Sequence, residues 1–206
     1  WAQGPDINHE SLMGFIIGWI RENRQRLGLE LKGVGHRVVH GGDAYSCPVR
    51  VDDTVLRTLE KFCPLAPLHQ PHNLGPIRSV MKLGADIPQV ACFDTAFHRT
   101  NPALAQIFAL PRELTDEGVR RYGFHGTSHL YVSKRAAVML GKAPKDCNII
   151  TMHIGNGVSH TAIKNGVSVD TSMGLTPLEG AVMGTRCGDL DPAIPAFIME
   201  KEGLSP

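Results

Sequence analysis

Arg121-Tyr-Gly-Phe-His-Gly-Thr-Ser-His129 is the stretch around which this sequence is organised. It places the imidazole of His125 between two glycines, just ahead of a predicted helix at 130–140. The glycines allow the backbone to approach a ligand closely, and Thr127 or Ser128 can cap the helix. Unpaired N–H groups at a helix start favour an anion. The stretch therefore predicts an anion site with a hydrogen-bonding histidine beside it.

The composition is that of an ordinary globular protein and excludes several classes of function. The chain has 206 residues, 42% hydrophobic and 20% charged, with a formal net charge of +1. No basic block stands out, which disfavours nucleic acid as a partner. The longest apolar run, 15–20, is too short to span a bilayer, so we expect no membrane partner. Five scattered cysteines without a C-x-x-C pair indicate reduced thiols in a cytoplasmic protein.

Hydrophobic periodicity and turn residues predict an α/β chain. Helices are expected at 9–27 (capped by Asn8), 53–62, 74–83 and 130–140, and strands at 33–40, 88–93, 148–153, 158–164 and 167–171. Residues 95–119 are expected to form short helices and loops. Because an antiparallel meander begins in mid-chain, we expect a domain boundary near Lys145, which gives domains of 1–147 and 148–206.

Two polar residues are associated with the first two predicted strands. Arg37 and Val39 share one face of the strand at 33–40, and a guanidinium beside a small apolar side chain suits a short carboxylic acid. The pair taken alone favours an incidental arginine on a partly exposed strand. Asp94 follows the strand at 88–93, at the end where ligands bind in open α/β sheets. It can position a metal, a water or a proton, or it can cap a helix.

Two glycine-containing segments in the second half suit phosphate. His153-Ile-Gly-Asn-Gly157 runs from a strand into a turn whose N–H groups can bind an anion, although a plain hairpin has the same pattern. A loop rich in Gly, Thr and Asp presents Arg186 as a second cation. Two arginines, a histidine and a glycine turn suit transfer of a phosphoryl group between oxygens, which depends mainly on positioning and charge stabilisation.

Six motifs together resemble the acetate kinase family, in the order expected for it, from about residue 33 to residue 193. They are Gly35-His-Arg-Val-Val-His-Gly-Gly42, Pro64-Leu-Ala-Pro-Leu-His69, Phe93-Asp-Thr-Ala-Phe-His98, Arg120-Arg-Tyr-Gly-Phe-His-Gly-Thr-Ser-His129, His153-Ile-Gly-Asn-Gly157, and Asp170-Thr-Ser-Met-Gly174 with Arg186-Cys-Gly-Asp189. The resemblance implies actin-like (ribonuclease H-like) ATPase lobes with mixed sheets flanked by helices. The chain would hold most of the first lobe and the start of the second.

The resemblance also implies roles for the residues that match the family's motifs. The catalytic residues would be Asp94, His125 and Arg186. The acid would be held by Arg37, and its methyl group would contact Val39, Leu68, Phe124 and Pro177. The ATP phosphates would be held by the segment His153, Ile154, Gly155, Asn156 and Gly157.

The activity implied is reversible transfer of the γ-phosphate of ATP to acetate, giving acetyl phosphate and ADP, with Mg²⁺, in a cytoplasmic homodimer. In family order, an N-terminal hairpin, the adenosine-binding glycine motifs and the residues linked to Mg²⁺ lie outside these 206 residues. We therefore expect this segment alone to be inactive. The alternatives are a propionate or butyrate kinase of the same family, against which Val39 argues, and a truncated segment that does not bind ATP.

Overall fold

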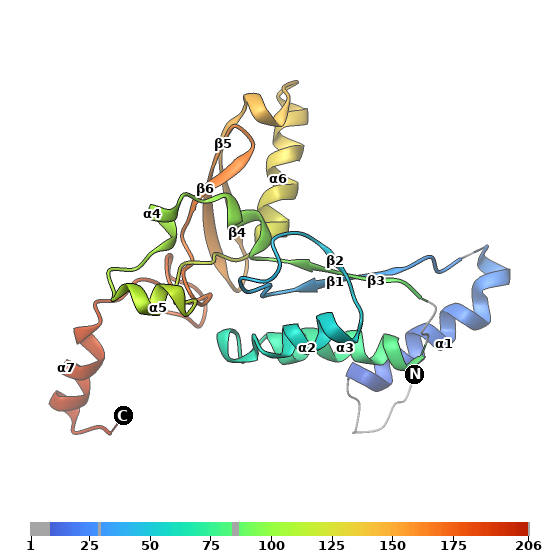
Figure 1. Ribbon diagram of the computed structural model, residues 1–206, viewed down its shortest axis with the longest axis horizontal. Coiled ribbons are helices and arrows are strands. Elements are labelled where there is room, and N and C mark those ends of the chain that lie inside the picture. The colour runs from blue at the N-terminus through green and yellow to red at the C-terminus, as the bar shows by residue number, and fades with distance from the viewer. Residues whose placement is uncertain (1–8, 29, 84–86, 206) are drawn as a thin grey trace. The chain divides into compact units, whose positions relative to one another are not determined.

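The computed structural model describes residues 9–28, 30–83 and 87–205 (Figure 1). The described parts of Trp1–Arg99 and Phe124–Leu130 form one compact unit, here unit 1, and those of Thr100–Gly123 and Tyr131–Pro206 form unit 2. The chain therefore enters unit 2, returns briefly to unit 1, and leaves it again inside a helix. The domain boundary that the start of the meander predicts near Lys145 stays a prediction.

Unit 1 is built on a three-stranded mixed sheet of order β1-β3-β2. β1 (Val34–Val38) pairs in parallel with β3 (Gln89–Phe93), which pairs antiparallel with β2 (Val49–Arg50). The connection from β1 to β3 carries β2, α2 (Asp53–Glu60), a 3₁₀ turn η1 (Cys63–Leu65) and α3 (Gln70–Leu83), and α1 (His9–Leu27) packs on α3. α2 begins where it does because Oδ1 of Asp52 accepts the N–H of Val55 at 2.8 Å.

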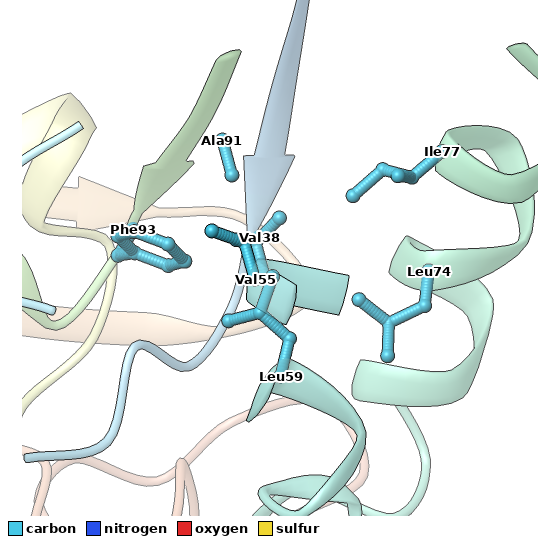
Figure 2. Packing of buried hydrophobic residues seen from close by; sticks show 7 residues of the cluster. All are labelled: Val38, Val55, Leu59, Leu74, Ile77, Ala91 and Phe93. Atoms are coloured by element: carbon cyan, nitrogen blue, oxygen red, sulfur yellow. The ribbon is translucent and has the colours of Figure 1, made fainter. Parts of the chain in front are cut away.

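The core of unit 1 lies between this sheet and the helices α2 and α3 (Figure 2). It consists of Val38, Ala91 and Phe93 from the strands, Val55 and Leu59 from α2, and Leu74 and Ile77 from α3. A fully buried aliphatic or aromatic side chain stabilises the fold by about 1.5–3 kcal/mol. This packing fixes the carboxyl ends of β1 and β3, where the candidate site begins.

Unit 2 contains the expected antiparallel meander. β4 (Asn148–Ile154), β5 (Val158–Lys164) and β6 (Val167–Thr171) pair in sequence order. The Asn165-Gly166 turn has φ values of +53° and +80°, as a type I′ hairpin turn requires.

The remaining elements are short, apart from two helices. They are η2 (Ala96–Thr100), α4 (Ala103–Gln106), α5 (Arg112–Asp116), α6 (Gly126–Met139), η3 (Pro144–Asp146) and α7 (Ala193–Glu202). Within the described ranges, no helix combines the length and the apolar character needed to cross a membrane.

The predicted helices and strands are confirmed in type, but several bounds are corrected. β1 ends at Val38, so Val39 lies beyond the strand and the predicted strand face shared by Arg37 and Val39 is wrong. α3 begins at Gln70 rather than at Leu74, ahead of the apolar pattern that predicted it.

The correction closest to the candidate site concerns the start of α6. It begins at Gly126 rather than near Leu130, so Thr127 and Ser128 lie in its first turn and neither caps it. The reason is that the N–H of His129 already bonds the carbonyl of His125 at 3.0 Å, which closes the first helical turn. The predicted cap at Asn8 lies outside the described residues.

Candidate active site

The centre of the candidate site in unit 1 is an ion pair between Arg37 and Asp94. Nε of Arg37 donates to Oδ1 of Asp94 at 3.0 Å, and Nη2 donates to Oδ2 at 2.6 Å. The Asp94 side chain is fully buried, whereas that of Arg37 is 62% exposed. This two-bond geometry fixes the plane of the guanidinium, and its outer side remains open to solvent.

Asp94 also connects three segments of unit 1 through its backbone and side chain. Its N–H donates to the carbonyl of Val38 at 3.0 Å, and its own carbonyl accepts the N–H of Gly126 at 2.9 Å. The hydroxyl of Thr127 lies 3.3 Å from Oδ1 and can donate to it. Asp94 therefore ties the end of β1 to the start of α6.

His125 directly precedes α6 in an unusual backbone conformation. Its φ is +56°, in the left-handed region that residues other than glycine rarely adopt. Immediately before it, the carbonyl of Phe124 accepts a hydrogen bond from Nε2 of His98 at 2.9 Å. The backbone on each side of His125 is thus held by a defined partner.

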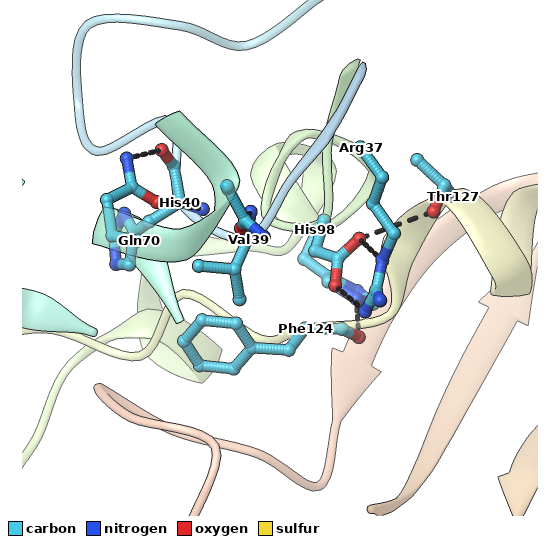
Figure 3. Close-up of polar contacts among 9 residues, drawn as sticks. Arg37, Val39, His40, Gln70, His98, Phe124 and Thr127 are labelled. Atoms are coloured by element: carbon cyan, nitrogen blue, oxygen red, sulfur yellow. Dashed lines mark hydrogen bonds and ion pairs between the residues drawn. The ribbon is translucent and has the colours of Figure 1, made fainter. Parts of the chain in front are cut away.

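The segment after β1 carries Val39, whose side chain is 5% exposed and points toward the ring of Phe124 (Figure 3). A side chain, not a neighbouring strand, satisfies the N–H of Val39. Oδ1 of Asn73 accepts the N–H of Val39 at 2.9 Å. Oε1 of Gln70 accepts the N–H of His40 at 3.2 Å, and Nε2 of Gln70 donates to the His40 carbonyl at 3.0 Å. Two amides of α3 therefore fix the position of Val39.

Unit 1 thus brings together five of the predicted site residues: Arg37, Val39, Asp94, Phe124 and His125. Leu68, the sixth predicted site residue of unit 1, lies in the turn before α3 and is 80% exposed.

In unit 2, Arg186 and Pro177 lie together. Nη1 of Arg186 donates to the carbonyl of Pro177 at 2.6 Å, and the carbonyl of Arg186 accepts the N–H of Met183 at 2.9 Å. His153 and Ile154 end β4, and the turn Gly155-Asn-Gly157 leads into β5. The N–H of Gly155 bonds the carbonyl of Gly157 at 3.0 Å, so that donor of the predicted phosphate turn is engaged within the turn itself.

Burial and hydrogen bonding shift two pKa values at the site of unit 1. The bonds to Asp94 raise the pKa of Arg37, so its guanidinium stays charged. Burial lowers the pKa of His98 to about 4, against smaller opposing effects of the Phe124 carbonyl and Asp94. His98 is therefore a neutral donor near neutral pH.

Over the described ranges, no group of three or more His, Cys, Asp or Glu side chains has the geometry to hold a metal ion. The carboxylate of Asp94 already accepts bonds from Arg37 and from Thr127.

Sequence reasoning missed the residues that support this site, namely Gln70, Asn73, His98 and Thr127. Two of them lie in motifs that the sequence shows: His98 in Phe93-Asp-Thr-Ala-Phe-His98, and Thr127 in the stretch 121–129, where it was predicted only as a helix cap. The two amides gave no signal, since they act on backbone groups 30 and 34 positions away.

Known proteins resemble this chain closely. The acetate kinase of Geobacter sulfurreducens is 65% identical over 177 residues, which cover 85% of the chain and 42% of that protein. The acetate kinase of Thermotoga maritima is 56% identical over 208 residues, which cover 98% of the chain and 51% of that protein. The chain thus spans about half the length of these relatives.

Solved structures agree with these relatives. The acetate kinase of Porphyromonas gingivalis superposes with a TM-score of 0.86 at 46% identity, covering 96% of this chain and 51% of that one. A propionate kinase from Francisella tularensis superposes with a TM-score of 0.88 at 43% identity and the same coverage. The likeness and the mixed sheet flanked by helices define the class, an α/β protein of the actin-like ATPase fold, of which this chain is a part. The profile of the acetokinase family matches residues 2–206. The chain belongs to the acetokinase family.

Proposed function

We propose that the protein carrying this chain is an acetate kinase, which transfers the γ-phosphoryl group of ATP to acetate and runs the reaction in both directions. The observation that supports this most directly is the oriented Arg37 guanidinium near the buried Val39 and Phe124, in a chain of the acetokinase family. A fixed cation near a small apolar surface suits a short carboxylic acid.

In this proposal, Arg37 binds the acetate carboxylate through the side of its guanidinium that Asp94 does not occupy. Val39 and Phe124 contact the methyl group, with Leu68 and Pro177 completing the pocket. Asp94 acts by holding the plane of the guanidinium, because both of its oxygens accept bonds from Arg37.

The transfer forms a bond between a carboxylate oxygen of acetate and the γ-phosphorus, and breaks the bond from that phosphorus to the β–γ bridging oxygen. Acetyl phosphate and ADP are the products. His125 and Arg186 would stabilise charge on the transferring phosphoryl group, and the segment His153–Gly157 would contact the ATP phosphates. Mg²⁺, bound with ATP, would neutralise charge on the phosphate oxygens.

Two alternatives remain from the sequence. A propionate or butyrate kinase would use the same residues with a wider pocket, and one similar structure is a propionate kinase. The relatives at 65% and 56% identity are acetate kinases, which favours the main proposal. A chain limited to these 206 residues would lack the family's adenosine-binding motifs, and we propose that it neither binds ATP nor turns over.

The test is formation of the acyl phosphate from acetate and Mg-ATP, trapped with hydroxylamine, with propionate and butyrate in parallel. It should use both the 206-residue chain and the longest polypeptide that contains it. We expect turnover of acetate by the longer polypeptide and its loss in Arg186→Ala. A folded longer polypeptide that phosphorylates no short acid would overturn the proposal.

We also propose a cytoplasmic homodimer, on the basis of the family resemblance. Light scattering after size-exclusion chromatography should give twice the mass of the longer polypeptide, and a monomeric mass at working concentration would contradict it.

A further inference from the structure

His98 is a buried histidine that the proposed chemistry does not use. It lies in η2, its relative exposure is 2%, and its Nε2 lies 2.9 Å from the carbonyl oxygen of Phe124. Because a carbonyl can only accept, Nε2 carries the proton and donates it. The acceptor belongs to the peptide bond that joins Phe124 to His125.

The peptide on the other side of His125 is held by the same short segment of chain. The N–H of Gly126 donates to the backbone carbonyl of Asp94 at 2.9 Å. A Cβ atom at Gly126 would lie 2.1 Å from that oxygen, so the close approach requires glycine. Asp94 and His98 thus hold the two backbone groups that flank His125.

These two anchors explain why His125 adopts its conformation. A φ of +56° costs free energy for any residue with a Cβ, and such a conformation persists only where its surroundings fix it. Without the bond to His98, the peptide group that joins Phe124 to His125 would be free to rotate toward a more common backbone conformation. The imidazole of His125 would then change direction.

The surroundings of His98 suit a permanent neutral donor. The rings of Phe97 and His129 pack against it, each with its centroid 5.8 Å away, and Asp94 carries a charge nearby. Burial keeps the pKa of His98 low, so the ring donates one proton and carries no charge under working conditions.

We propose that His98 is a positioning residue for phosphoryl transfer: by holding the Phe124 carbonyl, it fixes the left-handed backbone of His125 and so the direction of the His125 imidazole. The inference about activity rests on the proposed function. The inference about the backbone does not.

The test compares His98→Gln with His98→Met, two side chains of similar length. Glutamine keeps an N–H donor for the Phe124 carbonyl, and methionine does not. In the hydroxamate assay on the active polypeptide, we expect His98→Met to lower kcat about 100-fold while the KM for acetate changes by less than about threefold, since small misplacement of a catalytic group has effects of this order. His98→Gln should recover most of the loss.

His36→Met supplies the matched comparison. His36 is also a buried histidine whose Nε2 bonds one partner, Oε1 of Gln89, at 2.8 Å, on the face of β1 opposite to Arg37. This variant should lose stability and keep kcat. If His98→Gln and His98→Met lose kcat equally while folded, or if His98→Met keeps kcat, the proposal is wrong.

A second measurement needs no activity and no methionine variant. Amide hydrogen exchange reports the bond from Gly126 to Asp94 directly. In His98→Ala we expect the Gly126 amide to exchange at least about tenfold faster, measured relative to amides that exchange only by global unfolding, because local opening at Gly126 becomes easier. His98→Gln should stay near the unmodified protein. Unchanged exchange in the alanine variant would overturn the positioning role, whereas altered exchange in a protein inactive on every short acid would overturn only the proposed function.

Discussion

The carboxylate of Asp94 is fully buried, and both of its oxygens accept hydrogen bonds from Arg37, whose own side chain is 62% exposed. The pair is therefore asymmetric. Removal of Arg37 would leave a buried carboxylate without its partner, whereas removal of Asp94 would leave a guanidinium that water can solvate, because only the carboxylate is taken out of water.

Arg37→Ala tests this asymmetry. Breaking a fully buried ion pair costs about 3–5 kcal/mol, but water can reach the position of this guanidinium, so we expect a loss of about 1–2 kcal/mol in the free energy of unfolding. The kcat/KM for acetate should fall by at least about 100-fold, as expected when a charged, two-bond contact is lost. Urea unfolding and the hydroxamate assay measure the two effects. A loss of stability without a loss of kcat/KM would mean that Arg37 serves only Asp94.

Val39→Ala tests the acid pocket. Val39 is buried and points toward Phe124, so its truncation should open room for one more methylene (Figure 3). A methylene in such a pocket is worth about 1–3 kcal/mol, so the ratio of kcat/KM for propionate over acetate should rise about tenfold or more. Val34→Ala, the same change at the first residue of β1, should leave the ratio unaltered. An unaltered ratio in Val39→Ala would show that Val39 does not line the acid pocket.

The sequence predicted the elements of this fold well because hydrophobic periodicity and Gly or Asn turns are local signals. The Asn165-Gly166 hairpin is one such case. It predicted the start of α6 poorly, because Thr127 and Ser128 have cap-forming side chains, whereas the helix is set by the left-handed residue His125. No sequence rule marks a histidine for that conformation.

At the candidate site, too, local features of the sequence were predicted and long-range contacts were not. Arg37 and Asp94 were each predicted as site residues, but their mutual pairing was not, since it depends on the parallel register of β1 and β3 across 57 positions. The supporting contacts of Gln70 and His98 to backbone carbonyls were missed for the same reason. Long-range contacts to main-chain atoms leave no pattern in a single sequence.

Gly126→Ala tests the contact between α6 and Asp94. The added Cβ would lie 2.1 Å from a backbone oxygen, which cannot move aside as a side chain can. We expect a loss of about 2–4 kcal/mol in the free energy of unfolding, typical of forced overpacking with loss of a buried hydrogen bond. At Gly18 in α1, an added Cβ would have no atom within 4 Å. Gly18→Ala should therefore stabilise the protein by about 0.5–1 kcal/mol. Thermal or urea unfolding of both variants checks the opposite signs.

Gln70→Met tests the amide that holds the segment after β1. The side chain is fully buried, and it bonds the N–H and the carbonyl of His40 and also the carbonyl of Leu59. Methionine keeps the length and removes all three bonds, so we expect a loss of about 2–3 kcal/mol in the free energy of unfolding. The KM for acetate should rise with it, because Val39 adjoins the released backbone. Gln25→Met on the exposed face of α1 should change neither the free energy of unfolding nor the KM for acetate. An unaltered KM in Gln70→Met would show that the amide of Gln70 does not position the acid pocket.

The buried His98 should make the stability of unit 1 depend on pH. Its pKa is about 4 in the folded chain and has an ordinary value of 6.5 when exposed, so between these values the unfolded chain binds the proton and the folded chain does not. The stabilising effect is complete above pH 6.5 and is lost as the pH falls toward 4. The full difference corresponds to about 3 kcal/mol.

Urea unfolding at pH 7.5, 6 and 5 should therefore show a decline in stability that is smaller in His98→Gln, which has no proton to gain. His36, whose pKa burial also lowers, should contribute a separate part of the decline that His98→Gln retains. Asp94 is the charged group near His98, and His129 packs against its ring, so the comparison should be repeated in Asp94→Asn to separate the effect of the carboxylate. An equal decline in His98→Gln and the unmodified protein would show that His98 gains its proton as readily in the folded chain as in the unfolded one, and that it is not the enclosed neutral donor on which the conformation of His125 depends.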